Sequence, residues 1–310
     1  MFQEENSSPG FHITKRSLIT VLACVAVSML LMRTGFLTVF FLVPLGFAVF
    51  SCGSYMFTFA SAAAVNLIIY IISAAVVSGN DLNFLNMLID ISYLTALMFL
   101  FTWVTGGRNI RTAYRIILAS SISTIFFIIM INRLDSLFYT YSMEVAQELM
   151  PGIVTAEMIE FARNVLLRGG ALISMFFVFF INRQIASSIF WLVKKQRKDR
   201  GLIAFYAPDN TIWVFSGSLA TVILANIFGI EFLEIIAWNI FVICVIIFMA
   251  QGIGILSHLL SGKSSVFRIC SVVFFVILLF SPLIVIAVAA VLVLGIIEIW
   301  RPFRRNVDHL

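Results

Sequence analysis

Long apolar runs separated by short basic clusters are the feature that most limits how this chain can fold. A helix needs roughly 20 apolar residues to cross about 30 Å of hydrocarbon. Hydrophobic residues make up 62% of the 310 residues and charged residues 11%, whereas a soluble domain is typically about 45–50% apolar and about 25% charged. In water such a chain would expose large apolar patches. We therefore predict an integral membrane protein.

The runs are continuous, which predicts an all-α, polytopic transmembrane helical bundle rather than a β-barrel with its alternating segments of about 10 residues. The expected helices cover residues 17–32, 35–50, 54–77, 86–104, 113–131, 170–181 (with a possible extension to 193), 212–228 and 232–259. A last run, 269–299, contains Ser281-Pro282. Proline disfavours helix at the preceding residue, so we favour a hairpin, for about ten membrane segments, over one kinked helix, for about nine.

The charge distribution predicts orientation, because cytoplasmic loops carry an excess of Lys and Arg. No A-x-A cleavage site follows the first run, so we interpret it as an uncleaved helix with a cytoplasmic N-terminus. Alternating helices then collect on the inner side Lys15, Arg16, Arg108, Arg111, Arg115, Lys194, Lys195, Arg197, Lys198, Arg200, Lys263 and Arg268. The outer side collects only Arg33, Arg133, Arg163 and Arg168.

The same patterns divide the chain into five parts. These are a cytoplasmic N-terminal tail (1–14), helices 1 to 5 (15–131), an extracytoplasmic amphipathic segment (132–167), C-terminal membrane helices (168–300) and a cytoplasmic basic tail (301–310). Pro151-Gly152 breaks the amphipathic segment, so we expect two short helices at the outer interface. They form either a simple outer cap or a lid over a cavity.

Polar groups inside the membrane are costly and often functional, so they are the candidates for a ligand site. If the seventh and eighth helices form a hairpin, Asn226 and Asn239 can line one site with Glu234, because the turn between the helices is short. The predicted ligand cavity, open to the outer leaflet, comprises Asp90, Tyr93, Asn226, Glu234 and Asn239. The alternative is that such charged residues are interfacial or snorkelling, and that the amides join helices by hydrogen bonds.

Enzyme and metal signatures are missing from the sequence. The motifs HExxH, GxxxxGK[ST] and GxSxG do not occur. The four cysteines lie in or beside apolar runs without a CxxC pair, which favours packing over metal or redox chemistry. We predict no catalytic residue, no metal and no cofactor, and a protein that is not an enzyme. Active transport would therefore need a separate ATPase or an ion gradient.

The second half of the chain, roughly 200–305, resembles the YybS-like family of bacterial polytopic membrane proteins (domain of unknown function 2232). The residues that carry the resemblance are Phe205, Pro208, Trp213, Gln251-Gly252, Gly295, Glu298, Trp300, Phe303 and Arg304. That family is similar to the substrate-binding S-components of energy-coupling-factor vitamin transporters, and the rod-shape protein MreD looks like a further relative.

The resemblance implies a bundle with an S-component-like core in the bacterial cytoplasmic (inner) membrane. It would be a small-molecule-binding transport component that lacks its own ATPase. The expected partners are the lipid bilayer, other membrane subunits and a small apolar ligand. Nucleic acid is not expected, because the basic residues sit between apolar runs. The alternative is a non-transporting scaffold for envelope or cell-shape machinery, whose partner or lipid contacts would be Lys194, Lys195, Arg197, Trp300 and Arg304.

Overall fold

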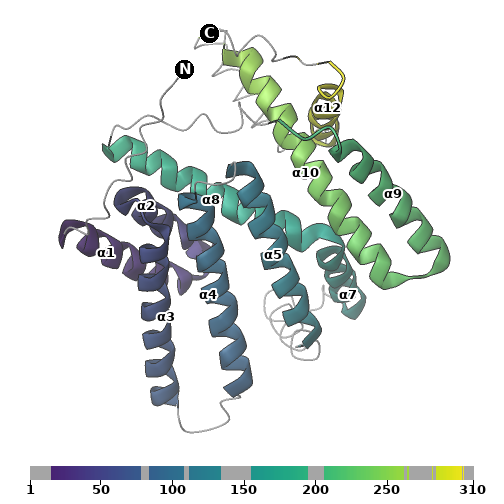
Figure 1. The fold of residues 1–310 in the computed structure, drawn as a ribbon. Coiled ribbons are helices and arrows are strands. Elements are labelled where there is room, and N and C mark those ends of the chain that lie inside the picture. The colour runs from purple at the N-terminus through teal and green to yellow at the C-terminus, as the bar shows by residue number, and fades with distance from the viewer. Residues whose placement is uncertain are drawn as a thin grey trace. The chain divides into compact units, whose positions relative to one another are not determined.

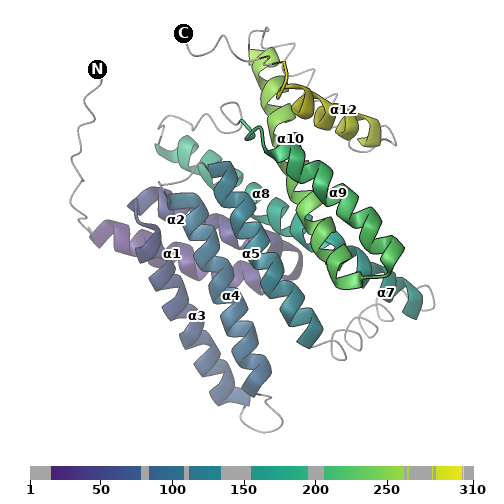
Figure 2. The same cartoon turned by 45° about the vertical axis from the view of Figure 1, so that its right-hand side comes forward.

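All regular structure in the described part of the chain is helical, which confirms the all-α class. The computed structural model describes residues 15–77, 84–107, 112–133, 155–194, 206–261, 264, 281, 284–301 and 303 (Figures 1 and 2). In chain order the elements are α1 (Lys15–Met32), η1 (Gly35–Phe40), α2 (Leu42–Cys52), α3 (Tyr55–Val77), α4 (Phe84–Gly106), α5 (Thr112–Arg133), α7 (Ala156–Val165), η2 (Leu166–Gly170), α8 (Ala171–Lys194), α9 (Thr211–Phe228), α10 (Glu231–Ser261) and α12 (Ile284–Ile297).

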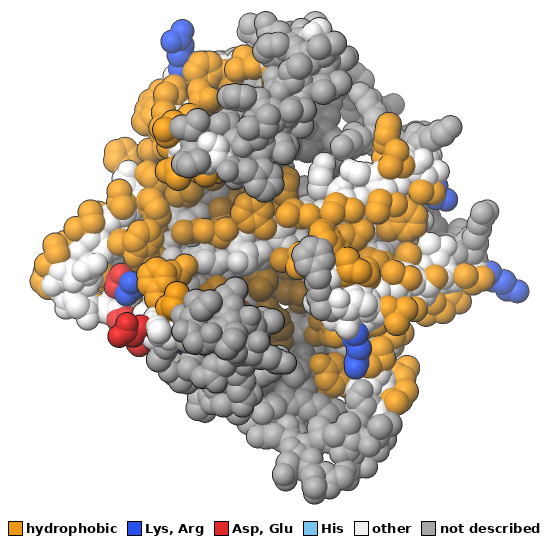
Figure 3. All heavy atoms as spheres, turned by 180° about the vertical axis from the view of Figure 1, so that it is seen from behind, with side chains coloured by type: hydrophobic (Ala, Val, Ile, Leu, Met, Phe, Trp, Pro, Cys, Tyr) orange, Lys and Arg blue, Asp and Glu red, His pale blue; other side chains and the backbone are white. Residues whose placement is uncertain are grey.

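Five helical stretches among the described residues are long and apolar enough to cross a membrane. They lie in α3, α5, α7 joined to α8, α9 and α10, with mean hydropathy between 1.7 and 2.5. Large apolar side chains cover much of the described surface, and charged side chains appear only in small groups (Figure 3). Helices with so much exposed apolar surface need lipid around them. The protein is therefore a multi-pass integral membrane protein.

The chain divides into two compact units, residues 1–111 with 177–198 and residues 112–176 with 199–310. Each unit combines two separate stretches of the chain. Helix α8 is shared between them, with residues 171–176 in the second unit and its remaining residues in the first.

In the first unit, α1 packs on α2 and α3, and α4 packs on α2 and α3. The approach of α2 to α8 is close, since a Cβ atom on Gly46 would lie 2.7 Å from Cβ of Ala186. The rings of Phe101 and Phe179 stack nearby with centroids 6.1 Å apart. Small side chains on both helices thus allow their backbones to meet, as membrane helix packing requires.

The second predicted helix, 35–50, is divided in the structure. A 3₁₀ segment, η1, precedes α2, and Gly53 follows α2 with a left-handed φ of 71°. Pro44 explains the division: in a helix from residue 35 it would lie in the interior, whereas α2 starts at Leu42 and places it in the first turn, where a missing N–H costs nothing. Asn182 also donates from Nδ2 to the Val39 carbonyl at 2.8 Å and so holds η1 in place.

In the second unit, α9 and α10 form the predicted hairpin and run side by side in both views (Figures 1 and 2). The turn is short because Gly229 adopts φ 67° and its amide donates to the Asn226 carbonyl at 3.3 Å. Helix α12 packs against α10 and begins three residues after Ser281. Residues 265–280 lie outside the described part, so the choice between a hairpin and one kinked helix stays a prediction.

The crossing of α10 and α12 is tight at two glycines. A Cβ atom on Gly252 would overlap the carbonyl oxygen of Val291, and one on Gly295 would overlap the carbonyl oxygen of Phe248. Gln251 is buried beside them and donates from Nε2 to the Gly295 carbonyl at 3.1 Å. We call these residues, Gln251, Gly252 and Gly295, the glycine crossing.

Candidate functional site

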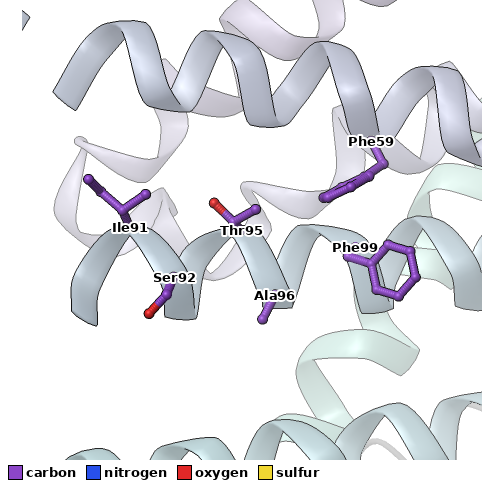
Figure 4. Close-up of a pocket in the computed structure, with 6 residues that line it drawn as sticks. All are labelled: Phe59, Ile91, Ser92, Thr95, Ala96 and Phe99. Carbon is purple, nitrogen blue, oxygen red and sulfur yellow. The ribbon is translucent and has the colours of Figure 1, made fainter. Parts of the chain in front are cut away.

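An apolar hollow lies against α4 in the first unit. It is lined by Phe59 of α3 and by Ile91, Ser92, Thr95, Ala96 and Phe99 of α4 (Figure 4). Its volume is about 540 Å³, and it is shallow and widely open. Small-molecule sites typically measure about 300–1,000 Å³, so the hollow has room for a small ligand or part of a lipid chain.

Two hydroxyl groups, those of Ser92 and Thr95, belong to the lining of the hollow. Asn66 is buried on α3 and donates from Nδ2 to Oγ1 of Thr95 at 3.2 Å. Because Oγ1 is the acceptor in this bond, the hydroxyl keeps a proton that it can donate. At another part of the lining, the rings of Phe59 and Phe99 meet edge to face with centroids 5.0 Å apart. The arrangement suits an apolar molecule with few polar groups.

The predicted residues of the first unit both belong to α4, and Tyr93 is not among the residues that line this hollow. Tyr93 is half-buried, and the lining residues follow another stripe of the helix. Asp90 also belongs to α4, and its side chain lies outside the described residues. Polar residues in the sequence do not point to this hollow, because its lining is mostly apolar. The available signal was the small pair Ser92 and Ala96 on a face with Ile91 and Phe99.

The predicted residues of the second unit do not share one environment. Asn226 is exposed on α9. Glu234 is buried in the first turn of α10, and its Oε2 lies 3.4 Å from Nη2 of Arg168. Asn239 donates from Nδ2 to the Leu167 carbonyl at 2.8 Å and to the Ile235 carbonyl at 2.9 Å. Both Glu234 and Asn239 therefore contact the segment between α7 and α8.

That segment, η2, is a π-helical kink. Arg168 has φ −87° and ψ 26°, and Gly169 has φ 118°, a conformation that only glycine adopts readily. A Cβ atom on Gly169 would lie 2.7 Å from Cγ2 of Val242 on α10. We call the contacts of Glu234, Asn239 and Val242 with residues 167–169 the kink dock. Single π-helical turns frequently occur at functional sites, which makes the kink dock a second candidate region.

The residues that carried the family resemblance partly converge. Gln251 Oε1 accepts from the Ala207 amide at 2.6 Å, and its Nε2 donates to the Gly295 carbonyl. This one side chain therefore connects the segment that precedes α9 with α12. Glu298 is buried one turn after Gly295. Trp213 is exposed, while Phe205 and Arg304 lie outside the described residues.

A cationic side chain lies near the middle of a membrane helix. Arg183 stands twelve residues after Ala171 and eleven before Lys194 in α8, and it is buried. The sequence alone does not place Arg183 at the centre, because its pattern allows this helix to end between residues 181 and 193. An arginine at the centre of a membrane helix costs about 2.5–3.5 kcal/mol on insertion scales, so Arg183 is a candidate for a specific role in packing or binding.

The predicted partner or lipid contacts are partly described. Lys194 is exposed at the end of α8, next to exposed Leu192, and Trp300 is 68% exposed after α12. Lys195, Arg197 and Arg304 lie outside the described residues. Within the described ranges, no group of three His, Cys, Asp or Glu side chains is placed to hold a metal ion.

Comparison of the chain with protein-family models, with curated proteins and with solved structures found no match. The YybS-like resemblance and the S-component-like core accordingly stay predictions from the sequence motifs.

Proposed function

We propose that the protein is a membrane-embedded binding component that accepts an apolar small molecule, or the chain of a lipid, in the hollow on α4. It would serve a transport process whose energy comes from a separate ATPase. The observation that carries the proposal is the hollow itself, with its apolar lining and the Thr95 hydroxyl oriented by Asn66.

The location of this hollow supports ligand entry from lipid rather than from water. The part of α3 beside it bears exposed apolar side chains such as Leu67 and Ile68. Apolar molecules concentrate in the bilayer, so a widely open site can be reached laterally. Glu234 and Asn239 already bond to residues of η2, so they are poorer candidates for binding a ligand. We therefore place the proposed site on α4 and not at the α9–α10 hairpin.

The test is photolabelling of the purified chain in phosphatidylcholine vesicles with a diazirine-bearing fatty acid. We expect saturable labelling of α4 peptides that an excess of unlabelled fatty acid prevents. Ala96→Phe, which places a ring in the hollow, should abolish the saturable fraction. The matched control is Ala64→Phe on α3, because Ala64 is exposed and lies outside the lining. Labelling that rises linearly with probe concentration and is the same in both variants would refute the binding site.

The transport part of the proposal is tested by purification from native membranes in mild detergent, followed by quantitative mass spectrometry. Recovery of an ATPase with its membrane coupling subunit supports a transport component. Recovery of cell-wall or division proteins, with ATPases at background, rejects it.

The second candidate is the scaffold. The observation that favours it is the exposed pair Trp300 and Arg301 beyond α12, which leaves an aromatic and a cationic group available to a partner. Deletion of residues 300–310 should then abolish co-purification of envelope proteins while the bundle still folds. Unchanged co-purification contradicts the scaffold.

We further propose that the protein resides in the bacterial cytoplasmic membrane with its N-terminus inside, on the basis of the Lys and Arg asymmetry. Reporter fusions test the orientation. A fluorescent protein joined before residue 1 should fluoresce, and alkaline phosphatase inserted after residue 155 should be active. The opposite pattern reverses the topology.

A further inference from the structure

Helix α7 exposes a narrow apolar stripe. Met158, Phe161 and Val165 are 53%, 71% and 47% exposed and are spaced three and four residues apart. At 3.6 residues per turn this spacing places them within about 60° of one another around the helix axis. Exposed Glu157 and Glu160 lie on other parts of the helix surface, outside the stripe. The exposed surface of α7 is therefore amphipathic.

The helix is well formed at its start. Thr155 has an extended conformation and its Oγ1 accepts from the Met158 amide at 3.4 Å, as an N-cap residue does. Glu157 in the first turn and Arg163 in the last turn both complement the helix dipole. Ile159 is buried and anchors the opposite side. The stripe thus belongs to an ordered helix with a defined inner face.

Helix length excludes α7 from the hydrocarbon interior. The run Glu157–Lys194 has 38 residues, or about 57 Å at 1.5 Å per residue, against a hydrocarbon thickness of about 30 Å. Helix α8 alone has 24 residues, or about 36 Å, which already suffices to span. The ten residues of α7 include Glu157, Glu160 and Arg163, which are costly in hydrocarbon.

The kink provides the change of direction that this length requires. The non-helical φ and ψ angles of Arg168 and Gly169 interrupt the run between α7 and α8. The kink dock then ties the same residues to α10 through Glu234, Asn239 and Val242. The exposed stripe of α7 and the exposed Ile173 near the start of α8 thus lie on either side of the kink.

We propose that α7 lies along one bilayer surface, with Met158, Phe161 and Val165 inserted among the acyl chains and Glu157 and Glu160 in the headgroup region. The occupant of the stripe is phospholipid, since three side chains cannot supply the roughly 800 Å² per partner of a stable protein interface. Its exposed charged side chains are acidic, so apolar contact rather than attraction to anionic lipid holds it there.

The test is spin labelling of the full-length protein in phosphatidylcholine vesicles. Single cysteines replace Phe161, Val165 and Glu160, and nitroxide collision rates with oxygen and with a water-soluble nickel chelate are measured. The unsubstituted chain gives the background from the native cysteines. Leu224→Cys on α9 serves as the lipid reference, and Asp209→Cys as the water reference, because both side chains are exposed.

Labels at 161 and 165 should collide with oxygen in preference to the nickel chelate, as the label at 224 does, and the label at 160 should show the reverse. The ratios should stay the same when a fifth of the lipid is phosphatidylglycerol. Equal chelate access at 161 and 209 would place the stripe in water and overturn the proposal. Low access of both reagents at 161 would show protein against the stripe and overturn it equally.

Discussion

The glycine crossing of α10 and α12 offers a prediction whose magnitude follows from the geometry. A methyl group on Gly295 would overlap the Phe248 carbonyl, which is backbone and cannot rotate away, so the two helices must separate. Overpacking of this kind costs typically 1–3 kcal/mol, or about 2 kcal/mol here. Separation also lengthens the Gln251–Gly295 hydrogen bond, whose net contribution is about 1 kcal/mol. We therefore expect Gly295→Ala to lower the free energy of unfolding by about 3 kcal/mol.

Gly217→Ala is the matched control for this substitution. Gly217 lies within α9, and a Cβ atom there would meet nothing within 4 Å. Alanine should therefore stabilise the helix by about 0.5–1 kcal/mol through the lower conformational entropy of the unfolded chain. Both variants replace glycine with alanine in the same unit, but the expected changes in the free energy of unfolding have opposite signs.

The assay is equilibrium unfolding in mixed micelles of dodecyl maltoside and dodecyl sulfate, followed by circular dichroism at 222 nm. Gly252→Ala and the double variant Gly252→Ala/Gly295→Ala complete a cycle. Once one methyl group has separated the helices, the second methyl group needs little further separation. The free energy of unfolding of the double variant should therefore fall by less than the sum of the two single decreases. A Gly295→Ala chain as stable as Gly217→Ala would refute the close crossing.

The remaining predictions use the same unfolding assay. Gln251→Leu leaves the Ala207 amide and the Gly295 carbonyl without this partner. It should lower the free energy of unfolding by about 1–3 kcal/mol, and an unchanged stability would mean that neither bond forms. Gly169→Ala forces a side chain into φ 118° and against Val242, so it should cost about 2 kcal/mol or more, and a neutral result would contradict the kink geometry. Glu234→Gln removes an ion pair with a partly exposed arginine and should cost at most about 1 kcal/mol, diminishing in high salt, and a larger loss would show that Glu234 has a further role.

The helices and their approximate ends could be predicted from the sequence because a membrane allows few alternatives. Each spanning segment must satisfy its backbone hydrogen bonds internally, so apolar length and polar breaks locate the helices. The predicted run 212–228 differs from α9 by one residue at its start, and the turn at Gly229 was recognisable from its shortness. The division of the second run was also accessible, since Pro44 could have been used to place the start of α2.

The candidate sites were less predictable, because the sequence identifies polar side chains in membrane helices but not the residues that they contact. Glu234 and Asn239 were predicted to line a ligand cavity because they are polar residues of a membrane helix, but the sequence contains no indication that Arg168 and Leu167 contact them. The hollow on α4 depends on the space beside Ser92 and Ala96, which is a property of packing.

By itself, the sequence determined that this is a multi-pass helical membrane protein, since hydropathy over about 20 residues is a local property that the bilayer converts directly into helices. Only the tertiary structure decided which helix faces meet. Apolar side chains are distributed around both α10 and α12, so no apolar stripe marks the face that packs. The crossing at Gly252 and Gly295 depends on where two backbones can approach. In lipid there is no hydrophobic force between helices to leave such a stripe in the sequence, so fit between small residues selects the contact.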